Sequence, residues 1–254
     1  MKNKYVNFIS DDHLLECIGN LHNAYLKAKN NISKKNFYSN KVDTIKLTFD
    51  AQFNEIDEEK LIQSEILRQI DKSINNSIGT FHEQILGGIK GYEAGNLSGY
   101  DIKANDDTLF ADIKNKHNTM NSSAAEALFQ KLARYANDYK KAKCYWVQIL
   151  AKGSFCELWS GDINGKEYSH SRVYKISGDQ FYALLSGQDN AMFQLYQALP
   201  KAIKDYLKSS KHNKEIIENS ALEEIKSKTK TSKRSVLDQI TFENYSYYLG
   251  FDKL

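Results

Sequence analysis

The segment from 109 to 151 constrains the fold of this chain most strongly, because it alternates two strand patterns with a helix pattern. Residues 109–114 form a short apolar run, and residues 143–151 form the strongest strand pattern in the chain. Between them, one apolar stripe repeats at helical spacing: Ala125, Leu128, Phe129, Leu132 and Ala136. A helix that crosses between two strands of one sheet leaves those strands parallel. The sequence therefore predicts an α/β core with a central sheet flanked by helices.

Charged residues interrupt the first of these strands. Asp112 and Lys114 lie two residues apart, so their side chains project from the same face. Turn residues at 105–107 connect this strand to a segment at Asp101, whose carboxylate can reach that face. Two carboxylates and one ammonium suit metal-assisted hydrolysis of a phosphodiester. We therefore identify Asp101, Asp112 and Lys114 as candidate catalytic residues; a surface ion pair is the simpler alternative for the last two.

A dense polar run follows the candidate catalytic strand. Residues 115–123 are almost all hydrogen-bonding or charged, and such a run stabilises no hydrophobic core. It suits contact with phosphates and base edges of a nucleic acid. The DNA-binding candidates in this run are Lys116, His117, Asn118, Thr119 and Asn121. For Lys116, the alternative is a solvated charge.

Four stretches of the sequence resemble one known family. They are Asp-Ile-Lys-Asn-Lys-His-Asn-Thr at 112–119, Ile-Gly-Thr-Phe-His-Glu-Gln-Ile-Leu-Gly at 78–87, Phe-Ile-Ser-Asp at 8–11, and the run from Ser to Gly at 177–187. Together they resemble the type II restriction endonucleases that cut GGWCC and GGNCC sites, over roughly residues 5–200. That family belongs to the PD-(D/E)xK nuclease superfamily.

The resemblance implies a role for each residue of the pattern. Asp101 matches the first acidic position, Asp112 the second, and Lys114 the lysine. Tyr100 stands where the superfamily has proline, and Asp112 stands where glutamate is common. Glu83, on the preceding helix, matches an upstream carboxylate that joins the metal site in many of these nucleases; a surface glutamate is the equal alternative. The implied cofactor is Mg²⁺, held by Asp101, Asp112 and Glu83.

The implied function is Mg²⁺-dependent cleavage of both strands of DNA at a short palindromic site of the GGNCC type, leaving 5′-phosphates. A palindromic target implies a homodimer, and a cognate DNA methyltransferase would be a functional rather than a physical partner. Two alternatives remain open: a structure-selective or repair nuclease with the same core, and a non-catalytic DNA-binding protein. No phosphate-binding loop motif supports an ATP-driven activity.

The composition indicates a cellular compartment for this protein but does not identify a binding partner. The formal net charge of +3 on 254 residues is too small to identify nucleic acid by itself. Three cysteines at no metal-like spacing predict free thiols in a reducing cytoplasm. No apolar run approaches the length of a membrane span, so no membrane partner is expected. The clearest basic patch, at 226–234, either grips phosphates or is a solvated loop; its DNA-binding candidates are Lys228, Lys230, Lys233 and Arg234.

We expect one nuclease domain over 1–254, with a helical part at 1–76, a catalytic core at 77–176 and a helical part at 177–254. Within it, Ser10 or Asp11 caps a first helix. Further helices are expected at about 57–74 and 78–86, the latter stopped by glycines at 87–88. A capping box at 123–126 should begin the crossing helix, and Pro200 should sit in the first turn of a new helix.

Overall fold

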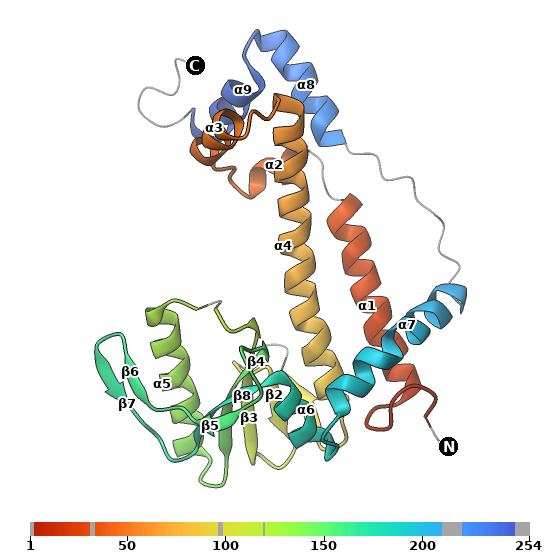
Figure 1. Cartoon of the computed structure of the whole chain (residues 1–254), viewed down its shortest axis with the longest axis vertical. Helices are drawn as coiled ribbons and strands as arrows, with labels where there is room; N and C mark the ends of the chain where they lie inside the picture. Colours follow the sequence, from red (N-terminus) through yellow and green to blue (C-terminus); the bar gives the residue numbers. More distant parts are fainter. Residues whose placement is uncertain (1–2, 31–33, 96–98, 119, 210–219, 247–254) are drawn as a thin grey trace. The chain divides into compact units, whose positions relative to one another are not determined.

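The computed structural model describes residues 3–30, 34–95, 99–118, 120–209 and 220–246 (Figure 1). The chain divides into two compact units: Met1–Leu21 with Ser77–His212, here called the sheet unit, and His22–Asn76 with Asn213–Leu254, here called the helical unit. That both act as one nuclease domain stays a prediction. Within the described ranges, no helix is both long and apolar enough to cross a membrane.

The elements follow the expected order of helices, strands and helices. The helices are α1 (Asp11–Asn30), α2 (Lys34–Ser39), α3 (Thr44–Phe53), α4 (Glu58–Gly87), α5 (Ser122–Asp138), α6 (Gly178–Ser186), α7 (Ala191–Ser209), α8 (Ser220–Ser232) and α9 (Val236–Tyr245). The strands are β1 (Tyr92–Ala94), β2 (Ile102–Ala104), β3 (Leu109–Lys116), β4 (Lys143–Leu150), β5 (Cys156–Leu158), β6 (Gly161–Ile163), β7 (Lys166–Tyr168) and β8 (Val173–Ser177). Sequence patterns did not reveal β1, β6 and β7, because three-residue strands carry almost no periodicity.

A mixed six-stranded sheet forms the centre of the sheet unit, in the order β1-β2-β3-β4-β8-β5. β2 and β3 form the expected antiparallel hairpin, and β3 pairs with β4 in parallel, so both predictions are confirmed. β8 continues the parallel set, and β5 closes the edge in antiparallel. The predicted α/β fold with a mixed central sheet is therefore confirmed.

Alternating residues of β3 face two different hydrophobic cores. Ala111 and Ile113 belong to the larger core, which packs against α1, α4, α6 and α7. Phe110 belongs to a second core built with α5, and its ring stacks on Tyr135 of that helix at 4.8 Å between centroids. By the same alternation, Asp112 projects on the α5 side of the sheet. Figure 1 shows α5 beside the sheet on this face.

The start of α5 differs from the expected capping box. The N-cap is Asn121, whose side chain accepts a hydrogen bond from the backbone N–H of Ala124 at 2.9 Å. Glu126 is therefore free to bind elsewhere, and its carboxylate accepts hydrogen bonds from Asn164, Lys166 and Tyr168. These bonds lower the pKa of Glu126 to about 2. The carboxylate thus fastens the β6–β7 hairpin to α5 instead of capping the helix.

Two expected helix boundaries are wrong. The predicted helices at 57–74 and 78–86 form one continuous helix, α4, which ends at Gly87 as expected. The Asn-Asn-Ser sequence at 75–77 lies between the two predicted ranges, but weak helix formers cost only tenths of a kcal/mol each, which leaves a long helix intact. Pro200 lies inside α7 and does not begin a helix. Its neighbours Leu195, Leu199 and Ala202 pack in the larger core, and this packing outweighs the hydrogen bond that proline removes.

Of the two candidate caps for α1, Ser10 is the one observed. Its hydroxyl accepts a hydrogen bond from the N–H of His13. Asp11 instead accepts the backbone N–H groups of Lys4 and Tyr5, which holds the preceding segment. The start of α1 also packs closely against residue 88, which explains why this residue is a glycine: a Cβ on Gly88 would lie 2.1 Å from the His13 ring.

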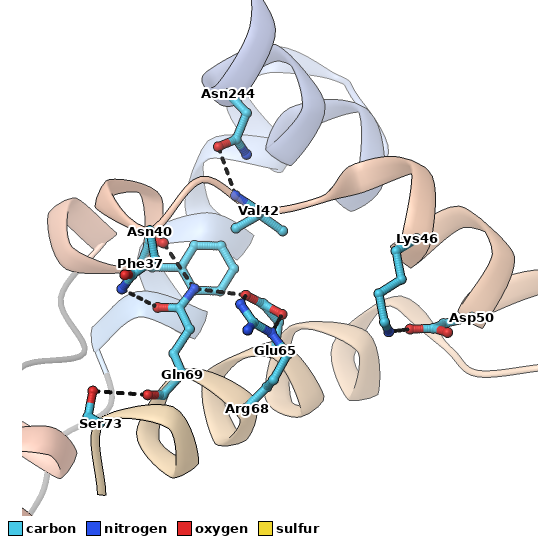
Figure 2. Close-up of polar contacts among 10 residues, drawn as sticks. All are labelled: Phe37, Asn40, Val42, Lys46, Asp50, Glu65, Arg68, Gln69, Ser73 and Asn244. Carbon is cyan, nitrogen blue, oxygen red and sulfur yellow. Dashed lines mark hydrogen bonds and ion pairs between the residues drawn. The ribbon is translucent and has the colours of Figure 1, made fainter. Parts of the chain in front are cut away.

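The helical unit has its own core, formed by residues of α2, α3, α4, α8 and α9 and the loop after α2: Phe37, Val42, Leu47, Leu61, Ile62, Ile66, Ile225 and Ile240. Figure 2 shows the polar contacts that border this core. The Gln69 amide donates to the carbonyl of Phe37 and to the buried carboxylate of Glu65, which Arg68 also binds. The buried Asn244 accepts the N–H of Val42. These bonds satisfy a backbone carbonyl of α2 and a backbone N–H of the short segment between α2 and α3.

Candidate active site

Asp112 is almost completely enclosed, at 4% exposure, in the middle of β3. Its backbone neighbour on β4 is Trp146, a large side chain that faces the same layer and packs against the second core. A buried carboxylate is stable only when protein groups bind both of its oxygens. Two lysines meet that need.

The Lys114 ammonium contacts Asp112 Oδ1 at 2.5 Å, as its position two residues along the strand predicts. The second contact was not predicted: Lys131 Nζ, from α5, contacts Oδ2 at 2.5 Å. A signal for Lys131 was present in the sequence. It lies three residues after Leu128 and four before Tyr135, on the helix stripe that packs against the sheet. A charge on the inner stripe of a crossing helix needs a partner on the strand beneath.

Asp101 stands directly before β2, on the same side of the sheet as Asp112. Its backbone N–H binds the carbonyl of Ala111, and its carboxylate accepts the N–H of Ile113 at 2.6 Å. Burial raises the pKa of Asp101, and the neighbouring charge of Asp112 raises it further; Lys114 and Lys131 act in the opposite direction. The two carboxylates are therefore close enough for the charge of Asp112 to affect the pKa of Asp101.

The charges of the same cluster act on Glu83, which lies on α4. Burial raises its pKa first and the charge of Asp101 second, while Lys114 lowers it and Asp112 raises it. Burial is thus the main cause of the raised pKa of both Glu83 and Asp101, and a neighbouring carboxylate adds to it in each case. Carboxylate oxygens in such a cluster suit a hard divalent cation.

The geometry of this conformation does not yet form a cation site. Among the residues that the structure describes, no three His, Cys, Asp or Glu side chains gather closely enough to hold a metal ion. Both oxygens of Asp112 are bound by lysine ammonium groups, and one oxygen of Asp101 is bound by a backbone N–H. The carboxylate oxygens are nevertheless of the donor type that a divalent metal prefers, and the assignment of Glu83, Asp101 and Asp112 as its ligands stays a prediction.

His82, next to Glu83, plays a different part. Its Nδ1 lies 2.9 Å from the hydroxyl of Tyr182. Burial lowers the pKa of His82 to about 4 and raises that of Tyr182. The tyrosine therefore stays protonated, and its O–H donates a hydrogen bond to the neutral imidazole. This pair joins α4 to α6 within the larger core and contributes no charge to the carboxylate cluster.

The polar run after β3 is only partly available for DNA. Lys116 and Asn118 are exposed, and Thr119 lies outside the described residues. His117 packs against the end of β4, where its N–H donates to the carbonyl of Leu150 and its Nδ1 lies 3.3 Å from the same oxygen. The side-chain oxygen of Asn121 is already used as the cap of α5.

The second set of DNA-binding candidates lies in the helical unit. Residues 226–232 belong to α8, so this part of the basic patch is helical rather than a loop. Lys228 binds Glu243, and the Arg234 guanidinium lies 3.8 Å from the ring centroid of Phe242. Lys230 and Lys233 are exposed. The local contacts thus leave Lys230 and Lys233 as the better candidates for a phosphate contact.

Comparison with known proteins identifies the family. The family model of the Eco47II restriction endonuclease matches residues 6–208. The type II restriction enzyme Sau96I of Staphylococcus aureus is 39% identical over 265 aligned residues, which cover 99% of this chain and 100% of that enzyme. The type II restriction enzyme Eco47II of Escherichia coli is 28% identical over 217 residues, 81% of this chain and 89% of that enzyme. The chain therefore belongs to the Eco47II restriction endonuclease family.

Proposed function

We propose that this protein cuts both strands of duplex DNA at a short symmetric site, with Asp101, Asp112 and Lys114 as its catalytic residues. Family membership confirms the expected enzyme class, a site-specific deoxyribonuclease. The observation that carries the assignment of the site is the arrangement of Asp112. It is a buried carboxylate on the central strand, paired with the lysine two residues away and repelled by a second carboxylate.

The roles of these residues follow from their chemistry. Lys114 is an ammonium that is 34% exposed, so it can reach a water molecule or a phosphate while staying beside Asp112. It would orient the attacking water and stabilise the charge that develops on the phosphate. Asp101 is held by the N–H of Ile113, which fixes one carboxylate oxygen and leaves the other for a ligand.

Mg²⁺ is the cofactor that we propose for this site, held by Asp101 and Asp112 with Glu83 as a third ligand. When bound, it would polarise the phosphate and supply an activated water. The repulsion among the three carboxylates favours its binding, because a divalent cation removes that repulsion.

The proposed target is a GGNCC-type site, cut to leave 5′-phosphates, as the family resemblance implies. A twofold target read by one type of chain is matched by a homodimer. Sedimentation would then give twice the mass of the single chain, which is 29.1 kDa. The proposed setting is the cytoplasm, where a cognate DNA methyltransferase would protect the same site in the host DNA. That methyltransferase is a functional partner and need not bind this protein.

Digestion of unmodified plasmid DNA, followed by sequencing of the fragment ends, tests this function directly. We expect discrete fragments in the presence of Mg²⁺, none with a chelator, and ends that define one palindromic site. Smeared or junction-dependent cleavage would instead support a structure-selective or repair nuclease. Sequence-specific binding without turnover in any divalent metal would support a non-catalytic DNA-binding protein.

A further inference from the structure

The carboxylate of Asp112 is surrounded by more positive charge than the Asp-x-Lys pattern explains. Lys114 accounts for Oδ1, but Oδ2 is bound at 2.5 Å by Lys131, which lies on a different element. Because Asp112 is only 4% exposed, water cannot replace either contact easily. The protein therefore uses a second ammonium to neutralise an oxygen that the proposed cation site needs.

The two lysines are not equivalent. Lys114 shares strand β3 with Asp112, so its ammonium stays near the carboxylate whatever α5 does. Lys131 reaches the site from α5 on a flexible four-carbon stem, and its side chain is 28% exposed. An ammonium with this much access to water can leave the carboxylate and be hydrated again without a change in the backbone. Because Lys114 is similarly exposed, at 34%, the two lysines differ in the element that carries them and not in their access to water. Oδ2, whose partner comes from α5, is the oxygen that a cation can bind while Lys114 stays beside Oδ1.

The charge of Lys131 also reaches the other acidic residue. Its ammonium is one of the groups that lower the pKa of Asp101, after the N–H of Ile113 and Lys114. Three carboxylates and two ammonium groups interact in this cluster. A divalent cation that binds Asp112 Oδ2 must displace Lys131 from it, since one oxygen deep in the fold cannot serve both cations at full strength.

We propose that Lys131 is a positioning residue that holds Asp112 in the cation-free protein and competes with the divalent cation for its Oδ2 oxygen. The inference rests on the proposed function, since it assumes that Asp112 is a metal ligand. The lysine keeps a buried carboxylate neutralised until the metal arrives, and it sets how much metal the site needs. Its loss should therefore destabilise the metal-free fold and strengthen metal binding at once.

The variant Lys131→Met tests this opposition, because methionine keeps the length and apolar stem of lysine without its charge. Melting temperature in a chelator and Ca²⁺ affinity by isothermal titration calorimetry are measured without DNA, so that no cleavage is involved. We expect Lys131→Met to melt at a lower temperature than the wild type and to bind Ca²⁺ about tenfold more tightly. A tenfold change in affinity corresponds to about 1.4 kcal/mol of binding free energy, which removal of one nearby positive charge would supply. Asp112→Asn should abolish this binding.

Arg134→Met is the matched control, since it removes one positive charge from an exposed position on the same helix, less than one turn further on. Its Ca²⁺ affinity should stay close to that of the wild type, and Lys131→Arg should restore the melting temperature in chelator. A purely structural role for Lys131 would weaken or leave unchanged the Ca²⁺ affinity of Lys131→Met, which overturns the proposal. Equal tightening in Arg134→Met, or no Ca²⁺ binding by the wild type, overturns it too. A wild type that binds Ca²⁺ as expected but cuts no DNA would refute the proposed function alone.

Discussion

At the scale of single residues, the two acidic members of the candidate site should respond to neutralisation in opposite ways. Burial and the charge of Asp112 raise the pKa of Asp101, so its ionised form is less favourable in the fold than in the unfolded chain. Asp112 is bound by two ammonium groups. The sequence pattern treats the two positions alike, and only the contacts separate them.

Asp101→Asn should therefore raise the melting temperature of the metal-free protein by a few degrees while it abolishes cleavage. The amide oxygen can still accept the N–H of Ile113, and the repulsion from Asp112 and Glu83 disappears. Asp112→Asn is the comparison: it should also abolish cleavage but destabilise the fold by about 1–3 kcal/mol, because it leaves the partly exposed Lys114 and Lys131 without their charged partner. Denaturation in a chelator, beside plasmid cleavage with Mg²⁺, measures both effects. Equal stability changes in the two variants would contradict this assignment of charges.

A second prediction at this scale concerns His82 and acid. Its pKa is about 4 in the fold and 6.5 in the unfolded chain, so the unfolded chain binds a proton first as the pH falls. The stability contribution of neutral His82 is complete above pH 6.5 and is lost as the pH falls from 6.5 towards 4, by up to about 3 kcal/mol. His82→Asn keeps an acceptor for the Tyr182 hydroxyl and does not titrate. Chemical denaturation at pH 7 and pH 4.5 should show a smaller loss in the variant; parallel losses would mean that other groups cause the acid sensitivity.

At the scale of elements, long periodic patterns were predictable and local choices were not. The strands β3 and β4 and the inner stripe of α5 follow from apolar periodicity, and their parallel pairing follows from the crossing helix. The cap of α5 does not, since Asn121, Ser122 and Ser123 are all good caps and only the fold selects one. Lys131 was missed for a related reason: its place on the inner stripe of α5 indicates that it needs a partner, but sequence spacing does not identify that partner, which lies 19 residues away on another element.

The selected cap leads to a prediction that separates folding from recognition. Asn121→Ala should lower stability by about 1 kcal/mol, because it removes the acceptor for the N–H of Ala124. Asn121→Ser keeps a capping side chain and should retain most of this stability. Since the Asn121 oxygen is engaged, we expect Asn118→Ala rather than Asn121→Ser to change the preference among DNA sites. Melting curves, run beside cleavage competition between cognate and single-mismatch duplexes, decide it; an altered mismatch ratio in Asn121→Ser with an unaltered ratio in Asn118→Ala would reverse the assignment.

At the scale of the whole molecule, the sequence predicted helical parts at both ends of a sheet-containing core but not how they are assembled. The helical unit joins residues 22–76 to residues 213–254, which are far apart in the chain. Its core brings Phe37 and Leu47 together with Ile225 and Ile240. Each segment contributes apolar residues to this core, and periodicity alone cannot show which of them pair. The candidate DNA contacts consequently fall in both units, and the role of the helical unit becomes a separate question.

The double variant Lys230→Ala and Lys233→Ala addresses that question. The side chains of Lys230 and Lys233 are exposed, so the replacement of these two lysines should perturb the fold little. Lys226 and Lys228 are left in place because they form ion pairs with Glu59 and Glu243. If the helical unit binds phosphates, affinity should fall for all duplexes alike, and the slope of log K against log salt should flatten by about 0.9 for each lost contact, or about 1.8 for two. Preference for the cognate site should hardly change, because phosphates carry no base identity. Fluorescence anisotropy titrations at several salt concentrations measure the slope. An unchanged slope in a variant with an unchanged melting temperature would confine DNA binding to residues outside this patch and leave α8 as part of the helical core alone.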